Sequence, residues 1–248
     1  IGSGLVGSEM CIRDSGKIML FYLAPMEGIT GYIVRNAYAH YFPYIDKYFT
    51  PFIPAAKKMS KKIKRDLAAE NNGQIRLVPQ LIGNRADEFL MMIRQLEDLG
   101  FTSVNLNFGC PSGTVVSKRK GAGFLEEPEE LEMLLEEVLE NSPLAVSVKT
   151  RVGIKDPDEW EALCGVYAKF PLEELIIHPR LQNDYYSGTP RMETFARALE
   201  QIHVPLCYNG DICSVEDYKK VTAAFPAIDR IMICLLYTSP SPRDRSLS

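Results

Sequence analysis

Residues 145–178 read AVSVKTRVGIKDPDEWEALCGVYAKFPLEELIIH, and this stretch decides the fold class. It contains an apolar run at Ala145–Thr150, helical periodicity at Asp158–Ala168, and a second apolar run at Glu174–His178. A strand, a helix and a further strand in this order are typical of a βαβ unit, whose two strands are parallel. Lys149 and His178, at the ends of the two runs, give each strand a polar terminus.

The same alternation extends in both directions along the chain. Further strands are predicted at Leu20–Ala24, Ile45–Thr50, Leu77–Ile82, Ser103–Asn107, Pro205–Tyr208 and Arg230–Ile233. Further helices are predicted at Ala86–Leu99, Glu129–Glu140, Arg191–Gln201 and Val215–Ala224, where Pro128 suits a first helical turn and Ser214 an N-cap. Eight strands that alternate with helices predict an α/β fold, a (β/α)8 TIM barrel. No GxGxxG follows an early strand, which argues against an open sheet with a Rossmann site.

Composition sets the broad class of the protein. The 248 residues are 46% hydrophobic and 24% charged, which is typical of a globular domain, and no apolar run is long enough for a membrane span. We expect a cytoplasmic protein with no membrane partner. The six cysteines are irregularly spaced and form no CxxC pair, so neither a zinc site nor a disulfide framework is predicted.

Charge is uneven along the chain, although the net charge is −4. A local basic patch consists of Lys57, Lys58, Lys61, Lys62, Lys64 and Arg65. The patch can be a solvated helix face or a surface that contacts a nucleic-acid backbone.

The two ends of the chain differ in origin from its middle. Residues Glu9–Ser15 can be encoded by DNA whose reverse complement, in a shifted frame, encodes Cys234–Ser239. That DNA resembles a transposase adapter used in sequencing libraries. We therefore expect residues 1–15 and roughly 234–248 to be translated adapter, residues 16–233 to be the barrel domain, and the native chain to continue past Ile233.

Polar and special residues follow the predicted strands, at the carboxyl ends where barrel enzymes place their chemistry. They are Pro25-Met26-Glu27-Gly28, Gln80, Asn107-Phe108-Gly109-Cys110-Pro111, Lys149, His178 and Asn209-Gly210-Asp211. Six strand ends with such residues form a pattern that predicts an active site.

Residue chemistry leaves several roles open. Cys110 can act as a nucleophile, a metal ligand or a proton donor, and no nearby ligand spacing supports metal. Lys149 can form a Schiff base, bind phosphate or stabilise a developing anion. The amides of Gln80 and Asn107 suit the donor and acceptor edge of a heterocycle. Asn209-Gly210 lies in the usual phosphate zone of barrels.

Residues 20–233 resemble the catalytic barrel of the tRNA-dihydrouridine synthases. The order and spacing of several motifs carry the resemblance over essentially the whole segment between the tails. They are Ala24–Thr30 with Arg35, Asn107–Pro111 with Gly121–Gly123 and Pro128, Ser147–Arg151, His178–Arg180 with Tyr186–Gly188, and Asn209–Ile212.

The resemblance implies an FMN-dependent, NADPH-driven reduction of the C5–C6 double bond of a uridine in tRNA. Cys110 would protonate C5 as the general acid, while Asn107 and Arg180 would bind substrate. Among the flavin ligands, Pro25, Met26, Gln80 and His178 would contact the ring system, Lys149 would lie at its N1/O2 side, and Asn209 and Gly210 would approach the ribityl-phosphate. No metal is implied. The barrel would be cut off at its eighth strand, without the C-terminal helical domain of the family.

Two other functions fit parts of the pattern. A dihydroorotate- or dihydropyrimidine-dehydrogenase-like flavoenzyme shares the barrel, the flavin and a Cys or Ser loop, and acts on free pyrimidines. The run Lys118-Arg119-Lys120 and the Gly109-Cys110-Pro111 context favour the tRNA substrate. A non-catalytic RNA-binding barrel would use the same basic residues without any flavin.

Overall fold

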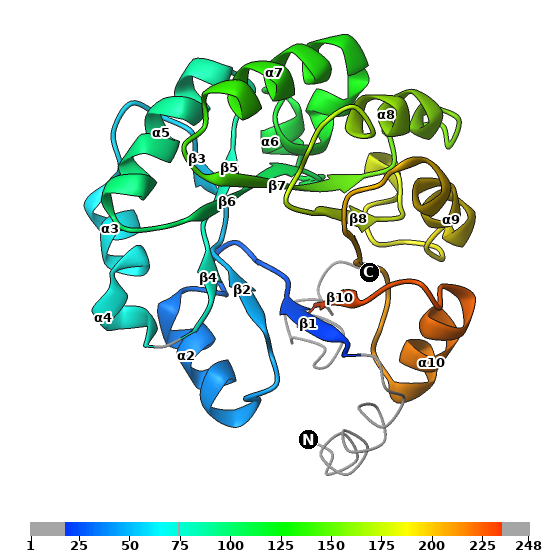
Figure 1. The fold of residues 1–248 in the computed structure, drawn as a ribbon, viewed down its shortest axis with the longest axis horizontal. Helices are drawn as coiled ribbons and strands as arrows, with labels where there is room; N and C mark the ends of the chain where they lie inside the picture. The colour runs from blue at the N-terminus through cyan, green and yellow to red at the C-terminus, as the bar shows by residue number, and fades with distance from the viewer. Residues whose placement is uncertain (1–17, 74, 235–248) are drawn as a thin grey trace.

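Parallel strands form a ring with helices on its outside in the computed structural model, which describes residues 18–73 and 75–234 (Figure 1). The strands are β1 (Leu20–Leu23), β2 (Lys47–Phe49), β3 (Ile53–Pro54), β4 (Leu77–Val78), β5 (Gln80–Ile82), β6 (Ser103–Phe108), β7 (Ala145–Arg151), β8 (Leu175–His178), β9 (Leu206–Tyr208) and β10 (Arg230–Ile233). Their order in the sheet is β3-β5-β6-β7-β8-β9-β10-β1-β2-β4.

The sheet closes into a barrel of eight strands within the described residues. Strands β4 and β5 are two parts of one strand interrupted at Pro79, which has no N–H to donate to a neighbour. Strands β2 and β3 are likewise two parts of one strand, since β2 pairs with β4 and β3 pairs with β5. The strand made of β4 and β5 also pairs with β6, so it joins the two ends of the order and closes the ring. The predicted TIM barrel and its eight strand positions are therefore confirmed.

The helices cover the outside of the ring. They are α2 (Tyr32–Tyr41), α3 (Lys61–Leu67), α4 (Ala69–Asn72), α5 (Ala86–Asp98), α6 (Gly113–Val116), α7 (Pro128–Asn141), α8 (Glu159–Tyr167), α9 (Met192–Gln201) and α10 (Val215–Ala224). All five predicted helices are present, Pro128 begins α7, and the Ser214 side chain accepts a hydrogen bond from the Asp217 N–H as an N-cap.

Helices α2, α3, α4 and α6 were not predicted, and α2 shows why. Its only buried residue is Arg35, whereas Ile33 and Tyr41 are exposed. An apolar stripe facing the core is the sequence signal of an amphipathic helix. A helix held by a buried arginine lacks that signal.

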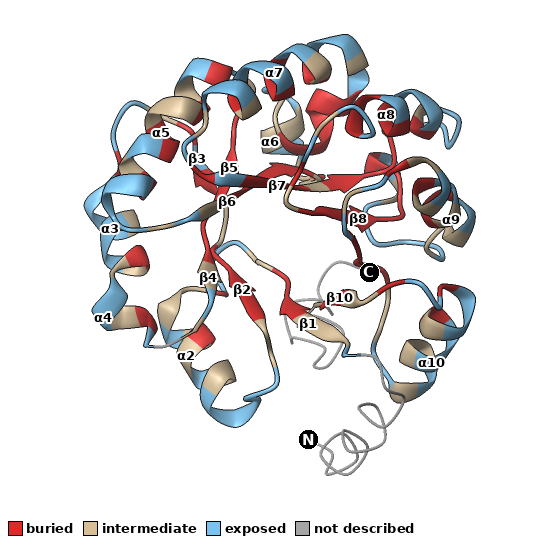
Figure 2. Ribbon diagram, in the orientation of Figure 1, coloured by how far each residue is buried: buried red, intermediate tan, exposed pale blue. Residues whose placement is uncertain are grey.

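Side chains alternate along each strand and so contribute to two hydrophobic layers. Figure 2 shows that the strands of the ring are mostly buried. Ile176 and Cys207 face the barrel interior with Tyr22, Phe49 and Met232. The residues on either side of them in β8 and β9 belong to the larger layer between strands and helices.

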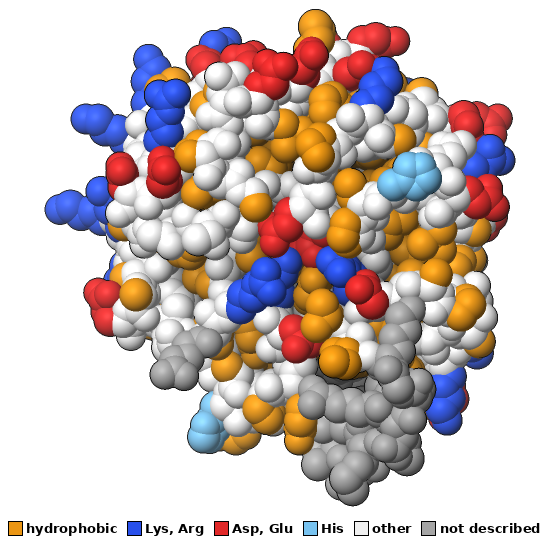
Figure 3. Space-filling model, in the orientation of Figure 1, with side chains coloured by type: hydrophobic (Ala, Val, Ile, Leu, Met, Phe, Trp, Pro, Cys, Tyr) orange, Lys and Arg blue, Asp and Glu red, His pale blue; other side chains and the backbone are white. Residues whose placement is uncertain are grey.

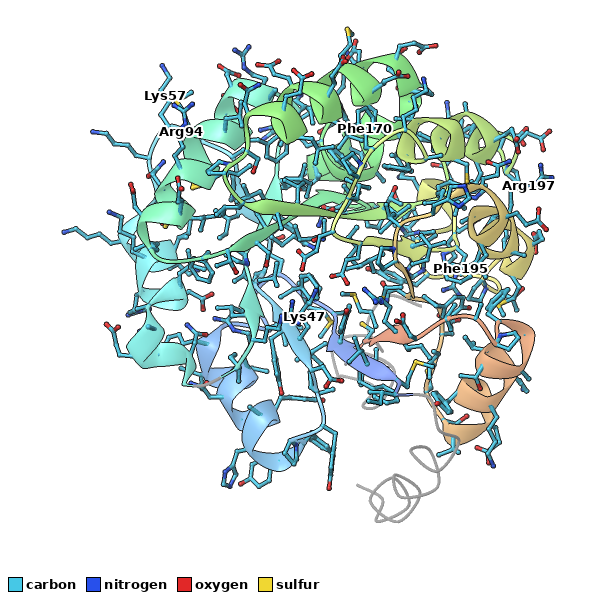
Figure 4. All side chains as sticks on the ribbon, viewed as in Figure 1. Lys47, Lys57, Arg94, Phe170, Phe195 and Arg197 are labelled. Atoms are coloured by element: carbon cyan, nitrogen blue, oxygen red, sulfur yellow. The ribbon has the colours of Figure 1, made fainter. Side chains whose placement is uncertain are left out.

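A buried ionic cluster closes the amino-terminal end of the barrel. Glu174, which is 1% exposed, accepts hydrogen bonds from Lys47 Nζ at 2.6 Å and Tyr22 Oη at 2.8 Å, and contacts Arg230 at 3.2 Å. Lys47 lies inside the ring of strands in Figure 4, and Figure 3 shows charged side chains at the centre of this face. Because this end is closed by ion pairs, the polar residues of the opposite, carboxyl end are free to form a site.

No helix in the described part of the chain is both long and apolar enough to cross a membrane. Within those same residues, no three His, Cys, Asp or Glu side chains are grouped so as to hold a metal ion.

Candidate active site

The inward faces of β6 and β7 are polar at the carboxyl end of the barrel. Residues alternate along each strand, and the register places Asn105 beside Ser147 and Asn107 beside Lys149. In an ordinary barrel core these positions would be apolar. The departure from that pattern marks this end as the candidate site.

Buried amides form a continuous chain of hydrogen bonds beneath the site. Asn107 Nδ2 donates to Gln80 Oε1 at 2.8 Å, and Gln80 Nε2 donates to Asn105 Oδ1 at 2.8 Å. Asn105 Nδ2 then donates to Ser147 Oγ at 2.9 Å. Gln80 is fully buried and its side chain orients Asn107, while its contact with a flavin stays a prediction.

Asn107 holds the cysteine loop. Its Oδ1 accepts from the Gly109 N–H at 3.0 Å and from the Cys110 N–H at 2.9 Å. On the other side of the loop, Arg151 Nε donates to the Gly109 carbonyl at 3.0 Å, and the Ala122 N–H donates to the Cys110 carbonyl at 3.0 Å. Four hydrogen bonds therefore fix a loop of two residues.

Gly121 packs directly against this loop. Its φ is +56°, and a Cβ added there would lie 2.8 Å from the Cys110 carbonyl oxygen. Only glycine combines that backbone conformation with that close approach at low cost.

Cys110 is half-buried, and its thiol retains its proton. Burial raises the pKa of the Cys110 thiol, with Glu27 adding to the rise and Lys149 and Arg151 opposing it. Nucleophilic cysteines have a depressed pKa, whereas a proton donor must be protonated at working pH. Of the three roles left open by the sequence, this environment favours the proton donor.

Lys149 is the second reactive group of the site. Its pKa is lowered to about 8, first because of burial and then because of the nearby Arg151 cation. Its ammonium forms no ion pair with any residue in the described ranges. Since an ammonium without a counterion is costly to bury, the position suits an anionic ligand.

Arg180 is the centre of a hydrogen-bond network that includes His178. Arg180 is 1% exposed and donates to the Ser187 and Gly188 carbonyls, to both oxygens of Asp211 at 2.7 and 2.6 Å, and to His178 Nε2 at 3.3 Å. These contacts use all five N–H groups of the guanidinium. These contacts hold the guanidinium in place, and its contact with substrate stays a prediction.

His178 is neutral in this environment. Burial lowers its pKa well below 6.5, and the charges of Lys149, Arg151 and Arg180 lower it further. Because Arg180 donates to Nε2, the ring proton is on Nδ1.

The loop after β9 requires a glycine at position 210 and has backbone N–H groups that can bind a ligand. A Cβ at Gly210 would lie 2.1 Å from the Tyr208 hydroxyl, so the adjacent tyrosine already requires glycine there. Asn209 is buried and donates from Nδ2 to the Met232 carbonyl at 2.9 Å. The backbone N–H groups of residues 210–212 donate to no residue that the structure describes. This run of donors suits a phosphate group.

Pro25 and Met26 lie half-buried at the rim of the site, after β1. Met26 is held by a tight turn in which its N–H donates to Thr30 Oγ1 at 2.8 Å. Arg35, which is fully buried, donates to the Thr30 carbonyl and to Asp66, and so ties this turn to α3.

Arg151 and Tyr186 were not assigned roles from the sequence. Arg151 lies over the Tyr186 ring at 5.3 Å, and the His178 ring meets the same tyrosine edge-on at 6.1 Å. Tyr186 is 52% exposed, so an aromatic surface borders the site. The sequence could have indicated Arg151, because Ser147, Lys149 and Arg151 are every second residue and so lie on one face of β7.

Comparisons with known proteins show which family the chain resembles. A sequence profile described as dihydrouridine synthase (Dus) matches residues 22–235. The chain is 30% identical over 213 residues to the tRNA-dihydrouridine(16) synthase of Pseudomonas putida, covering 82% of this chain and 65% of that one. It is 27% identical to tRNA-dihydrouridine synthase B of Pasteurella multocida, covering 86% of this chain and 64% of that one. The chain thus spans slightly less than two thirds of these relatives.

Solved structures share the fold at low identity. Morphinone reductase in complex with tetrahydroNAD aligns with a TM-score of 0.58 at 10% identity, covering 86% of this chain and 82% of that one. A variant of NCR from Zymomonas mobilis aligns with a TM-score of 0.57 at 12% identity, covering 86% and 81%. At this identity the likeness shows the barrel fold alone.

Proposed function

Since this chain belongs to the dihydrouridine synthase family, we propose that it reduces the C5–C6 double bond of a uridine in tRNA to give dihydrouridine. The observation that carries the proposal is a protonated Cys110 thiol and a Lys149 cation at the carboxyl end of the barrel, each of which influences the pKa of the other. We further propose that residues 16–233 are the catalytic barrel, that both tails are translated adapter, and that the protein acts in the cytoplasm, where it meets tRNA.

The site fits an FMN cofactor on two observations. Lys149 offers a cation with no counterion among the described residues, and the loop after β9 offers backbone N–H groups at Gly210, Asp211 and Ile212. Bound FMN, after reduction by NADPH, would supply a hydride to C6 of the uracil. Lys149 would stabilise negative charge near the flavin N1/O2 side, residues 210–212 would hold the phosphate, and Pro25 and Met26 would pack at the rim.

Cys110 supplies the proton. Once C6 has accepted a hydride, C5 carries negative charge and takes a proton from the thiol, which becomes a thiolate until solvent restores its proton. The raised pKa keeps the thiol protonated beforehand, and the adjacent charge of Lys149 stabilises the thiolate afterwards. Asn107 fixes the position of the thiol through the two backbone bonds of the loop.

The remaining predicted residues support these groups. Gln80 orients Asn107 through the amide chain. Arg180 fixes the tautomer of His178 through Nε2, and Asp211 fixes Arg180. His178 would then present its ring, without a positive charge, toward the flavin. Arg151 and Tyr186 would border the uracil.

The test compares two cysteine variants of this chain. Cys110→Ala is expected to keep the flavin absorption spectrum and NADPH-driven flavin reduction, and to lose most reduction of uridine in unmodified tRNA. Cys213→Ala removes an exposed cysteine after β9 and is the matched control, expected to retain turnover. Full turnover by Cys110→Ala contradicts the acid assignment.

Substrate and cofactor are tested in the same preparation. Reduction of free uracil or orotate with no reduction of tRNA would favour the free-pyrimidine enzyme instead. A colourless protein that binds no added FMN, yet binds tRNA, would favour the non-catalytic RNA-binding barrel.

A further inference from the structure

Exposed cations that form no ion pair gather along one side of the barrel. We name them the basic track: Lys57, Lys58, Lys61, Lys62, Lys64, Arg65, Arg94, Lys118 and Lys120. All are exposed except Lys120, which is half-buried. None of them forms a salt bridge with a residue in the described ranges.

Several other surface cations are paired with carboxylates. Arg85 contacts Asp87 at 2.9 Å, Arg119 contacts Glu130 at 3.1 Å, and Arg197 contacts Glu161 at 2.8 Å. A contiguous set of cations without such partners leaves its charge available to an external polyanion.

Hydrogen bonds and close contacts connect parts of the track to one another. The Lys57 carbonyl accepts a hydrogen bond from Gln95 on α5, next to Arg94. Figure 4 shows the side chains of Lys57 and Arg94 beside each other. A Cβ at Gly83 would lie 2.9 Å from Ala55 Cβ, so the loops after β3 and β5 are in contact.

Further hydrogen bonds connect the loop after β5 to the loop of Cys110. Asn84 Nδ2, in the loop after β5, donates to the Lys118 carbonyl at 3.2 Å. The Gly123 N–H donates to the Lys120 carbonyl, and the Ala122 N–H donates to the Cys110 carbonyl. Lys118 and Lys120 are therefore attached to the rigid loop that holds the proposed acid.

An acidic helix lies beside the track. Helix α7 carries Glu129, Glu130, Glu132, Glu136, Glu137 and Glu140. Figure 3 shows Lys and Arg side chains projecting over α3 and α5, and Asp and Glu gathered over α7. A polyanion is attracted to the first surface and repelled by the second, so the charge pattern fixes its direction of approach.

We propose that the basic track binds the phosphate backbone of the tRNA substrate and guides one strand of it to Cys110. The inference rests on the proposed function for the identity of the RNA. A strand of RNA fits a track that ends at a recessed thiol, because one base enters the barrel mouth while the phosphates of its neighbours stay outside.

The test measures binding of a fluorescent, unmodified tRNA transcript by this chain over a range of salt concentrations. Two variants each remove two track charges, K61Q/K62Q on α3 and K118Q/K120Q beside Cys110. The matched control, K219Q/K220Q, removes two exposed lysines from α10, which lies across the ring from α3 (Figure 1). Thermal unfolding checks that all variants are folded.

Each track variant is expected to weaken binding by roughly tenfold near 0.1 M salt and to lower the salt slope by roughly 1.5, as expected for two lost phosphate contacts. The control is expected to stay within about twofold, since it removes the same charge elsewhere. Equal weakening by all three variants, or by none, overturns the proposal, as does absence of tRNA binding by the parent chain.

Two further measurements separate the alternatives. Track variants that lose binding to phosphatidylserine vesicles but keep binding to tRNA would show a lipid surface and overturn the proposal. Binding is measured without turnover, so track-dependent tRNA binding by a chain that forms no dihydrouridine would refute the proposed function and support the track.

Discussion

Replacement of Lys149 by methionine is expected to stabilise the protein while it abolishes uridine reduction. The pKa of Lys149 is about 8 in the folded chain, in place of the usual 10.5. At about 1.36 kcal/mol for each tenfold change, this difference corresponds to about 3.4 kcal/mol. The side chain keeps some contact with solvent, so we expect a stabilisation of about 1 to 3 kcal/mol at pH 7.

The direction of the pH dependence follows from the number of protons that the folded and the unfolded chain bind. Between about pH 8 and pH 10.5, unfolded chains hold the Lys149 proton and folded chains do not, so the stability of the parent protein rises with pH in this window. Below pH 8 both states are protonated, and the full cost of the buried cation applies. The advantage of Lys149→Met is therefore complete at pH 7 and shrinks as pH rises through this window.

The assay is urea unfolding of the parent and the variant at pH 7.0 and at about pH 9.5, with the flavin removed. Lys219→Met, an exposed lysine on α10, is the control and is expected to change the free energy of unfolding by less than about 0.5 kcal/mol at either pH. A Lys149→Met variant that is less stable than the parent, or whose advantage does not depend on pH, would refute the reasoning. If Lys149→Met is more stable than the parent but loses turnover, the Lys149 cation is retained for function.

Two further substitutions test the packing of the site and of the closed end. Gly121→Ala is expected to destabilise the fold by about 2 to 4 kcal/mol and to displace Cys110, because the new Cβ adds left-handed backbone strain to a 2.8 Å overlap. Urea unfolding measures this loss of stability, and Gly113→Ala, which has open space around its Cβ, is the control. Equal effects of the two substitutions would contradict the prediction. Glu174→Gln is expected to cost about 3 to 5 kcal/mol, since it leaves the buried Lys47 and the half-buried Arg230 without their shared carboxylate. Exposed Glu216→Gln is the control, and a cost below about 1 kcal/mol would show that the cluster contributes little.

Much of the fold was readable because burial leaves a periodic signal. Apolar runs of strand length separated by amphipathic segments located all eight strands, and the helix over Val215–Ala224 was predicted to the residue. The signal fails where a polar group is buried, as in α2, whose only buried side chain is Arg35. The interruption of one strand at Pro79 also went unpredicted, because its partner residues lie far away along the chain.

The candidate site was also predictable only in part. Residue chemistry and motif order located Cys110, Lys149 and the loop after β9, but not which side chains face the open mouth. Gln80 and Arg180 illustrate the limit, because the sequence did not show that Gln80 donates to Asn105 and that Arg180 donates to Asp211. Arg151 was overlooked, although it lies on the same face of β7 as Lys149.

By itself the sequence determined the barrel, the strand ends that carry chemistry and the family. Only the tertiary structure decided the protonation of the site, because the pKa of Cys110 and of Lys149 depends on burial and on charges contributed by other strands. It also decided that the loop of Lys118 and Lys120 contacts the loop after β5, which in turn contacts the loop between β3 and α3. Lys118 and the lysines of α3 are separated by about fifty residues of chain and are joined only by contacts between loops.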